Sequence, residues 1–582
     1  MSGRRAGAPA PHAGANGDGS GRRLSAAWLL ICLPLAAAAL LSARLLGLAP
    51  LTAGYLRQDL LVVPLIWAVL ATAGALGSRL LSLDRGRPWL WSRIVLLAGL
   101  AGLVAYAGSW LVFERHLMTG DERMAEFDAR VFGTGRRFAV LPSEWRAYLP
   151  ALQPMFRLSG PNADWWMSGY LPINAFFRAG FGRLGDPALA GPFWAALSVG
   201  LTYAVGRRLR PAEPAVGVAA AVLLATSSQF LLAAMTPYAM PAHLALNMLW
   251  LLLFLRGGAL GHAGAIATGF LATGLHQLIF HPLFAAPFCL QLLIARRWTA
   301  AAAYALGYVG IGLFWASYWS WAFPTPPAVE NLSSATGWVR RAAELVGGFD
   351  AAAFGYMAAN LLRFVTWQNP LVAPLLALGV LGAWRADGHF RALWGGMALT
   401  AAAMLVLLPY QGHGWGYRYL HGLLGSACLL AAMTWSDLLR RGGDAARGRA
   451  LRQFAVTAGA AMLVLLPVRA WQANRYIHPF AEAARAIARA DAEVVVVDAA
   501  RLRFGADLVR NDPFLRNRPL VMDGRRLTAA DLARLCARGR VVLFTAEAGR
   551  SFGMEVLPPA DGSAGSGLAW PACTSPMAVS AS

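Results

Sequence analysis

The sequence predicts an all-α polytopic membrane protein with a small α/β domain near its C-terminal end. Of the 582 residues, 57% are hydrophobic and only 14% are charged, whereas soluble globular proteins usually have about 25% charged residues. A second observation is a series of apolar runs of about 20 residues, the length that a helix needs to cross a bilayer. The third is a change of pattern after residue 472, where short strand-like and helix-like runs alternate.

About thirteen segments satisfy the length rule for a membrane span. They lie at 25–47, 60–82, 94–113, 190–209, 215–234, 238–256, 262–280, 281–296, 299–320, 369–386, 390–409, 417–438 and 453–472. The arginine clusters between them all fall on one side, which the positive-inside rule assigns to the cytoplasm. The loops 114–189, 321–368 and 410–416, and everything after 472, then lie outside. This arrangement predicts a multi-pass protein of the bacterial inner (cytoplasmic) membrane whose active site faces the periplasm.

The chain is expected to divide into five parts. Residues 1–24 and 561–582 have the composition of disordered tails, the first of them cytoplasmic. Two additional N-terminal transmembrane helices and a cytoplasmic loop are expected at 25–93, and the catalytic membrane core at 94–472. The α/β domain is expected at 473–560, from a helix at 479–490, a strand at 493–498, a helix at 527–537 and a strand at 541–544.

Charge and cysteine content exclude several functions. The formal net charge is +22, but every residue counted as Lys or Arg is Arg, as codon bias in a GC-rich genome would produce. No basic run carries the interleaved aromatic residues of a nucleic-acid surface, so no nucleic-acid partner is predicted. The five cysteines include no CxxC pair and therefore indicate no metal site, although Cys536 and Cys573 could pair on an oxidising outer face.

The outer loop 114–189 begins with four carboxylates, on Asp121, Glu122, Glu126 and Asp128. Thr119 and Glu122 have the spacing of a capping box at a helix start. Glu126 and Asp128 fit a solvated helix face. Asp121 is not needed for the box, and the helix dipole favours its ionised form, as a proton acceptor requires. A simple favourable interaction with the dipole is the alternative explanation for Asp121.

The order of several motifs resembles that of the GT-C membrane glycosyltransferases. An Asp-Glu pair just outside a span is followed by a Gly-Arg, by Tyr170-Leu171-Pro172 before an aromatic amphipathic segment, and by "LGDPALAGPFWAALSVGLTYAVGRRLRP". The resemblance continues through "TGLHQLIFHP" to "GHGWGYRYLHG" and covers about 94–438. The most similar branch contains bacterial protein mannosyltransferase-like and aminoarabinose transferase-like enzymes.

The resemblance implies transfer of a sugar, with inversion, from a polyprenyl-phosphate donor to a lipid, glycan or protein acceptor on the outer face. It implies a general base that takes the acceptor proton and cations that stabilise the leaving phosphate. The resemblance implies no definite cofactor, and a divalent metal is possible but is not indicated by the sequence. The implied site residues are Asp121 and Glu122 for catalysis; Arg418, Arg136, Arg137, His281 and His413 for the donor phosphate; and Tyr170, Trp166, Asp164 and Tyr417 for substrate binding.

Each candidate also has a structural explanation. Arg418 fits a snorkelling arginine at a span end, His281 can satisfy a carbonyl freed by Pro282, and the aromatic residues near Tyr170 fit an interfacial belt. The chain also departs from the family: three spans precede the acidic loop instead of one, and Leu171 stands where relatives have Lys. The segment Thr236-Pro237-Tyr238 provides no second acid, a role that Asp164 could take.

A transporter or flippase for lipid-linked or envelope precursors is the main alternative function. Transporters usually carry ionisable groups at mid-membrane depth, whereas the predicted spans are nearly empty of acids. An O-antigen ligase or polymerase shares the donor and the compartment but not the early Asp-Glu pair. The concentration of polar residues on the outer loops therefore favours chemistry on a lipid-linked substrate.

Overall fold

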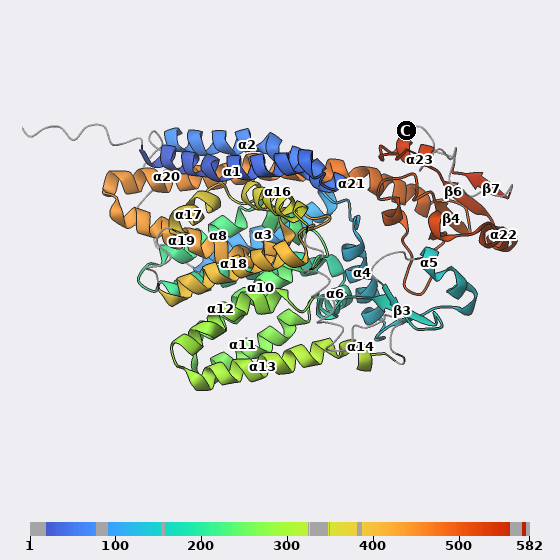
Figure 1. Cartoon of the computed structure of the whole chain (residues 1–582), viewed down its shortest axis with the longest axis horizontal. Coiled ribbons are helices and arrows are strands. Elements are labelled where there is room, and N and C mark those ends of the chain that lie inside the picture. The colour runs from blue at the N-terminus through green and yellow to red at the C-terminus, as the bar shows by residue number, and fades with distance from the viewer. Residues whose placement is uncertain are drawn as a thin grey trace, which may run out of the picture.

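The computed structural model describes residues 19–76, 91–152, 157–323, 325, 347, 350–380, 387–558 and 573–577. Long helices lie side by side in a bundle, and the segments outside the bundle gather at one end of it (Figure 1). Each of the thirteen segments predicted as spans contains a helix in its described part, so the multi-pass helical architecture is confirmed.

Eight helices in the described residues are long and apolar enough to cross a membrane. They are α1 (Gly19–Leu45), α2 (Pro50–Leu76), α3 (Trp91–Leu111), α7 (Ala190–Leu209), α13 (Trp298–Ala316), α18 (Gly388–Leu407), α19 (Leu424–Arg441), and α20 (Asp444–Ala460) joined to α21 (Leu466–Ala488). A ninth span results if α8 (Ala215–Ala225) and α9 (Ser228–Ala234), which meet at 61°, form one broken helix. The count is lower than thirteen because α10 (Met240–Arg256), α11 (Gly258–Thr273), α12 (Phe280–Ile294) and α17 (Val372–Val380) are shorter than 18 residues.

The outer surface of the bundle carries large apolar side chains that the protein itself does not cover. Leu30 on α1 and Leu61 on α2 are both 75% exposed, and Leu306 on α13 is 74% exposed. A water-soluble protein rarely exposes a continuous surface of this kind, whereas lipid contact requires one. The chain is therefore a multi-pass membrane protein.

A buried helix of the bundle, α16, was not predicted from the sequence. The described part of the expected outer loop 321–368 includes α16 (Ala352–Trp367), which packs on α1 and α2 with most of its side chains buried. Asn360 and Arg363 interrupt its apolar run, so it does not satisfy the rule for a span. Helix α2 also begins ten residues earlier than expected, which places Asp59 inside the bundle with 1% of its surface exposed.

The C-terminal region is an α/β unit, as predicted. Its four parallel strands have the order β5 (Leu520–Asp523), β4 (Val494–Val497), β6 (Val541–Phe544), β7 (Thr574–Pro576), and α22 (Ala529–Arg538) and α23 (Ala546–Ser551) accompany them. The prediction that 561–582 is wholly disordered is wrong for β7, which pairs with β6 and is tied to α22 by a Cys536–Cys573 disulfide. The other residues of that tail, and residues 1–18, lie outside the described residues.

The outer loop and the C-terminal region pack on each other. The loop contains α4 (Gly120–Gly133), α5 (Leu149–Leu152), α6 (Ile173–Arg183) and an antiparallel sheet of β1 (Ala139–Val140), β3 (Trp165–Ser168) and β2 (Arg157–Ser159), in that order. The Arg123 guanidinium donates to the Val509 carbonyl at 2.6 Å and to Asp507 at 3.0 Å, with both side chains buried. Since α4 carries Asp121, this contact fixes the acidic segment against the α/β unit.

Candidate active site

A cavity of about 310 Å³ lies between the start of α4, α10 and the segment that precedes α19. Its walls are mainly apolar, with contributions from Met240, Phe280, Leu408 and Leu423. The polar side chains on its surface are those of Asp121, Tyr170, His243, Asn247, His276, Gln277, Thr400, Tyr410, Gln411, Arg418 and Tyr419. An apolar cavity of this size with a few converging polar groups is typical of a small-molecule site.

The capping box predicted at Thr119 sets the position of Asp121. The Glu122 amide donates to Thr119 Oγ1 at 3.2 Å, and the Thr119 amide donates to Glu122 Oε2 at 3.0 Å. Thr119 Oγ1 also lies 3.0 Å from the Tyr238 hydroxyl, which ties the helix start to the bundle. Asp121 is therefore held in the first turn of α4 with its carboxylate at the cavity wall.

Asp121 is held as an ionised carboxylate. Its oxygens accept hydrogen bonds from the Arg418 guanidinium and from the Tyr170 hydroxyl. Burial favours the protonated acid, but the charge of Arg418 and the Tyr170 hydrogen bond outweigh burial and hold the pKa of Asp121 below its ordinary value. The site therefore presents a buried base that is already charged at neutral pH.

Arg418 begins the 3-10 turn η4 (Arg418–Leu423) and is positioned through its backbone. Its amide donates to Gln411 Oε1 at 3.1 Å, and its guanidinium lies 5.1 Å from the centre of the Tyr419 ring. One edge of the guanidinium is lightly used, because Nη2 makes only a 3.4 Å contact with the Tyr419 hydroxyl and Nε has no partner among the described residues. Two N–H groups on one planar edge match two oxygens of a phosphate.

Three of the expected site residues meet at this cavity: Asp121, Arg418 and Tyr170. Although Asp121 and Arg418 are 297 positions apart in the sequence, their side chains form an ion pair with 11% and 15% of their surfaces exposed. Glu122 is adjacent in sequence but points away from the cavity into the capping box, where it is buried.

The remaining expected residues lie outside the cavity lining. Arg136 and Arg137 are exposed beyond the end of α4. His281 is buried between Asn247 and Tyr308, at 2.7 and 2.6 Å, and His413 contacts the hydroxyls of Tyr55 and Tyr476 at 3.1 and 3.2 Å. Trp166 is fully buried and donates to the Pro513 carbonyl at 2.8 Å, Tyr417 is fully buried against Gln229 and Met357, and Asp164 lies in the turn before β3.

His276 and His243 also line the cavity, although neither is among the expected site residues. The His276 ring lies edge-on to the Tyr170 ring with centroids 4.0 Å apart. Both ring nitrogens of His243 lack a partner among the described residues. Only the three-dimensional arrangement shows that both rings line the cavity.

A second cavity, of about 160 Å³, lies near the middle of α4 and is lined by Arg115, Arg130, Arg178, His116 and Glu126. Its arginines already have acidic partners: Arg178 contacts Glu126 at 2.7 Å, and Arg115 contacts Asp186 at 2.6 Å. An anion entering this cavity would compete with those carboxylates, so Arg418 is the better candidate for phosphate.

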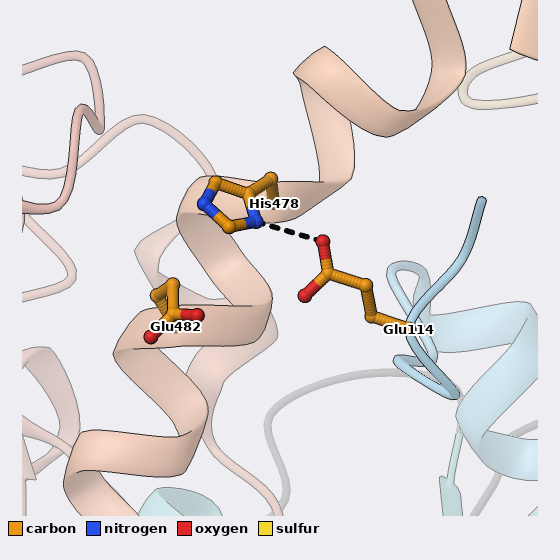
Figure 2. A group of neighbouring side chains, drawn as sticks. All are labelled: Glu114, His478 and Glu482. Carbon is orange, nitrogen blue, oxygen red and sulfur yellow. Dashed lines mark hydrogen bonds and ion pairs between the residues drawn. The ribbon is translucent and has the colours of Figure 1, made fainter. Parts of the chain in front are cut away.

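One group of His and Glu side chains in the described residues is close enough to hold a metal ion. His478 and Glu482 lie on one face of α21, and Glu114 reaches them from the chain between α3 and α4 (Figure 2). His478 Nδ1 is 2.7 Å from Glu114 Oε1. Arg485 contacts Glu114 and Glu482 at 2.6 Å each and so supplies the positive charge. These contacts link α21 to the segment that leads to α4.

Compared with the wild type, Glu122→Gln should stabilise the folded protein more at high pH than at low pH. Burial raises the pKa of Glu122 to about 7, above its unfolded value of about 4.3. The free energy of unfolding is therefore highest below about pH 4, where Glu122 is neutral in both the folded and the unfolded protein. It falls by on the order of 3 kcal/mol as the pH rises to 7. Gln can make the same capping bonds without ionising.

The measurement is thermal unfolding of the purified variant and of the wild type in one detergent, at pH 5 and pH 8. The difference in Tm between variant and wild type should be more positive at pH 8. An equal difference at the two pH values would show that Glu122 does not titrate in the folded protein.

No protein-family model matches the chain, and no curated protein matches it. Several solved structures are similar in fold, among them two of ArnT. The crystal structure of ArnT from Cupriavidus metallidurans in the apo state aligns with a TM-score of 0.44 and 13% identity, over 74% of this chain and 89% of that chain. The structure of ArnT from the same organism bound to undecaprenyl phosphate aligns with a TM-score of 0.38 and 16% identity, over 74% and 85%. This likeness concerns the fold alone.

Proposed function

We propose that the protein is an integral-membrane glycosyltransferase that moves a sugar, with inversion, from a polyprenyl-phosphate donor to a cell-envelope acceptor. The observation that carries the proposal is the pairing of an ionised Asp121 with Arg418 at the wall of a mainly apolar cavity. A base for the acceptor and a cation for a lipid phosphate are the two groups that such a transfer requires.

The chemistry is a single displacement. Asp121 takes the proton from an acceptor hydroxyl as that oxygen forms a bond to the anomeric carbon of the sugar. The bond between the anomeric carbon and the phosphate oxygen breaks on the opposite face, so the configuration inverts. The leaving lipid phosphate keeps the electron pair of that bond, and the Arg418 guanidinium stabilises the charge that develops on it.

The lightly used edge of Arg418 supports these separate roles, with Asp121 as the base and Arg418 as the phosphate-binding group. Nη1 contacts Asp121, while Nε and Nη2 carry no strong partner. A phosphate oxygen that meets Nη2 would not displace Asp121 from Nη1, and the carboxylate would stay beside the reacting centre. The apolar wall formed by Met240, Phe280, Leu408 and Leu423 suits the first isoprene units of the donor.

The Cys536–Cys573 disulfide supports an active site on the outer face. Disulfides persist in oxidising compartments such as the periplasm and are rare in the cytosol. The α/β unit that contains this bond packs on α4 through Arg123, Asp507 and Val509. An outward location of the α/β unit therefore places the start of α4, and with it Asp121, on the same side.

The test is a comparison of envelope glycans by mass spectrometry in the native host, with the gene deleted and then restored. Deletion should remove one sugar from one glycan, and the wild-type gene should restore it. Purified protein in lipid nanodiscs should transfer the same sugar from its polyprenyl-phosphate donor. Unchanged glycans together with lost uptake of a solute would contradict the proposal and favour the transporter.

A further inference from the structure

A buried charge cluster centred on Asp59 of α2 lies outside the proposed chemistry. The Asp59 carboxylate contacts Arg363 of α16 at 3.1 Å and Arg469 of α21 at 2.9 Å, and it accepts a hydrogen bond from Trp367 Nε1 at 2.8 Å. The three charged side chains are each no more than 2% exposed. A charged cluster buried this deeply in a membrane protein is generally functional or forms a specific structural link.

Arg363 connects this cluster to the segment that carries Arg418. Its Nε donates to the Gly416 carbonyl at 3.1 Å, and its Nη2 donates to the Gly414 carbonyl at 2.9 Å. The guanidinium also lies 3.8 Å from the centre of the Tyr55 ring of α2. Arg363 thus packs one face of its guanidinium on α2 and donates hydrogen bonds from one edge to the backbone just before Arg418.

The segment from Gln411 to Arg418 needs this support because its conformation is unusual. Gly416 has a φ of +74°, and a Cβ atom at this position would lie 2.3 Å from the Gln229 side chain. Gln229 donates to the Tyr417 carbonyl at 2.8 Å, and Gln411 accepts from the Arg418 amide at 3.1 Å. No regular secondary structure pairs these backbone groups, so buried side chains do so.

We propose that Asp59 and Arg363 are positioning residues for Arg418, and that the N-terminal pair α1 and α2 thereby belongs to the support of the active site. Asp59 fixes the guanidinium of Arg363, and Arg363 fixes the carbonyls of Gly414 and Gly416. The direction of the Arg418 side chain towards Asp121 follows from that backbone. The catalytic consequence rests on the proposed function, whereas the mechanical link does not.

Arg363→Lys is the sharpest test of the link. Lysine keeps the positive charge beside Asp59, but its ammonium cannot reproduce the planar fork that meets two carbonyls while pairing with a carboxylate. Arg469→Gln is the matched control, because Arg469 pairs with the same carboxylate and donates only to the Thr366 carbonyl and Gln472, away from the 411–418 segment. Asp59→Asn is the complementary variant and removes the central charge.

The first readout is amide hydrogen exchange of peptides covering 411–418, measured on the purified full-length variants. Exchange should be at least tenfold faster in Arg363→Lys and Asp59→Asn than in the wild type, and within twofold of wild type in Arg469→Gln. Equal exchange in Arg363→Lys and the wild type would overturn the proposal. An equal increase in Arg469→Gln would overturn it too, because general loosening of the bundle would then explain the result.

The second readout separates this proposal from the proposed function. In the transfer assay, Arg363→Lys should lower kcat/KM about tenfold through both donor KM and kcat, while Arg469→Gln changes neither by more than twofold. If the wild type neither transfers sugar nor binds a polyprenyl monophosphate, the proposed function fails and the exchange data alone decide the link. Faster exchange with unchanged kinetics would overturn the positioning role. If Asp59→Asn does not fold, Arg363→Lys decides the outcome.

Discussion

Asp121→Asn is expected to reduce the rate of sugar transfer about 10²- to 10⁴-fold, the range that a general base contributes. The amide has the shape of the carboxylate and can still accept from Tyr170, but it cannot take the acceptor proton. The donor KM should not rise, since Arg418 loses its acidic partner Asp121 and becomes freer to bind phosphate. The measurement is the initial rate in nanodiscs across a range of donor concentrations.

The control for this variant is Glu122→Gln, which removes the adjacent carboxylate from the same helical turn without altering the cavity. It should keep at least half of the wild-type rate at pH 7. If Asp121→Asn retained more than a third of the wild-type rate, another group would have to be the base. Asp121 would then serve only to position Arg418.

Arg418→Gln should lower kcat/KM about 10²- to 10³-fold, as loss of one donor to a developing negative charge usually does. It should also change the pH profile. In the wild type, Arg418 and Tyr170 hold the pKa of Asp121 below its ordinary value, so the acid limb should lie below about pH 4. Without Arg418, burial of Asp121 raises its pKa, and the acid limb should move to higher pH.

The measurement is kcat/KM between pH 4 and pH 9 for the variant and the wild type. Arg136→Gln is the matched control, because Arg136 is an exposed arginine near α4 that does not line the cavity. It should leave both the rate and the pH profile unchanged. An acid limb at the same pH in Arg418→Gln and the wild type would show that Asp121 does not depend on Arg418 for its ionised state.

The sequence identifies Asp121 and Arg418 because each lies in a polar motif beside an apolar run, where local chemistry stands out. Arg136 and Arg137 were expected at the site because they are near Asp121 in sequence. However, α4 ends at Gly133, and they continue away from the bundle. Arg136 and Arg137 are therefore near Asp121 in sequence but far from it in space, since a 14-residue helix separates its two ends by about 20 Å.

Trp166 and His281 show a second limit of predicting site residues from the sequence. Both have the residue type of a binding site, but Trp166 is covered by the segment around Pro513 and His281 by Asn247 and Tyr308. Burial by distant parts of the chain cannot be inferred from a motif. The same holds for β5 and β7, because a short parallel strand is stabilised by its neighbours rather than by its own pattern.

The joined helices α20 and α21 run for 45 residues, from Asp444 to Ala488, with a π-helical turn at Ala461–Leu465. At about 1.5 Å per residue this is about 67 Å, more than twice the thickness of the bilayer core. The expected boundary at residue 472 lies inside this helix rather than in a linker. One continuous helix therefore joins the membrane bundle to the α/β unit, and its length sets how far that unit, together with the start of α4, lies from the opposite end of the bundle.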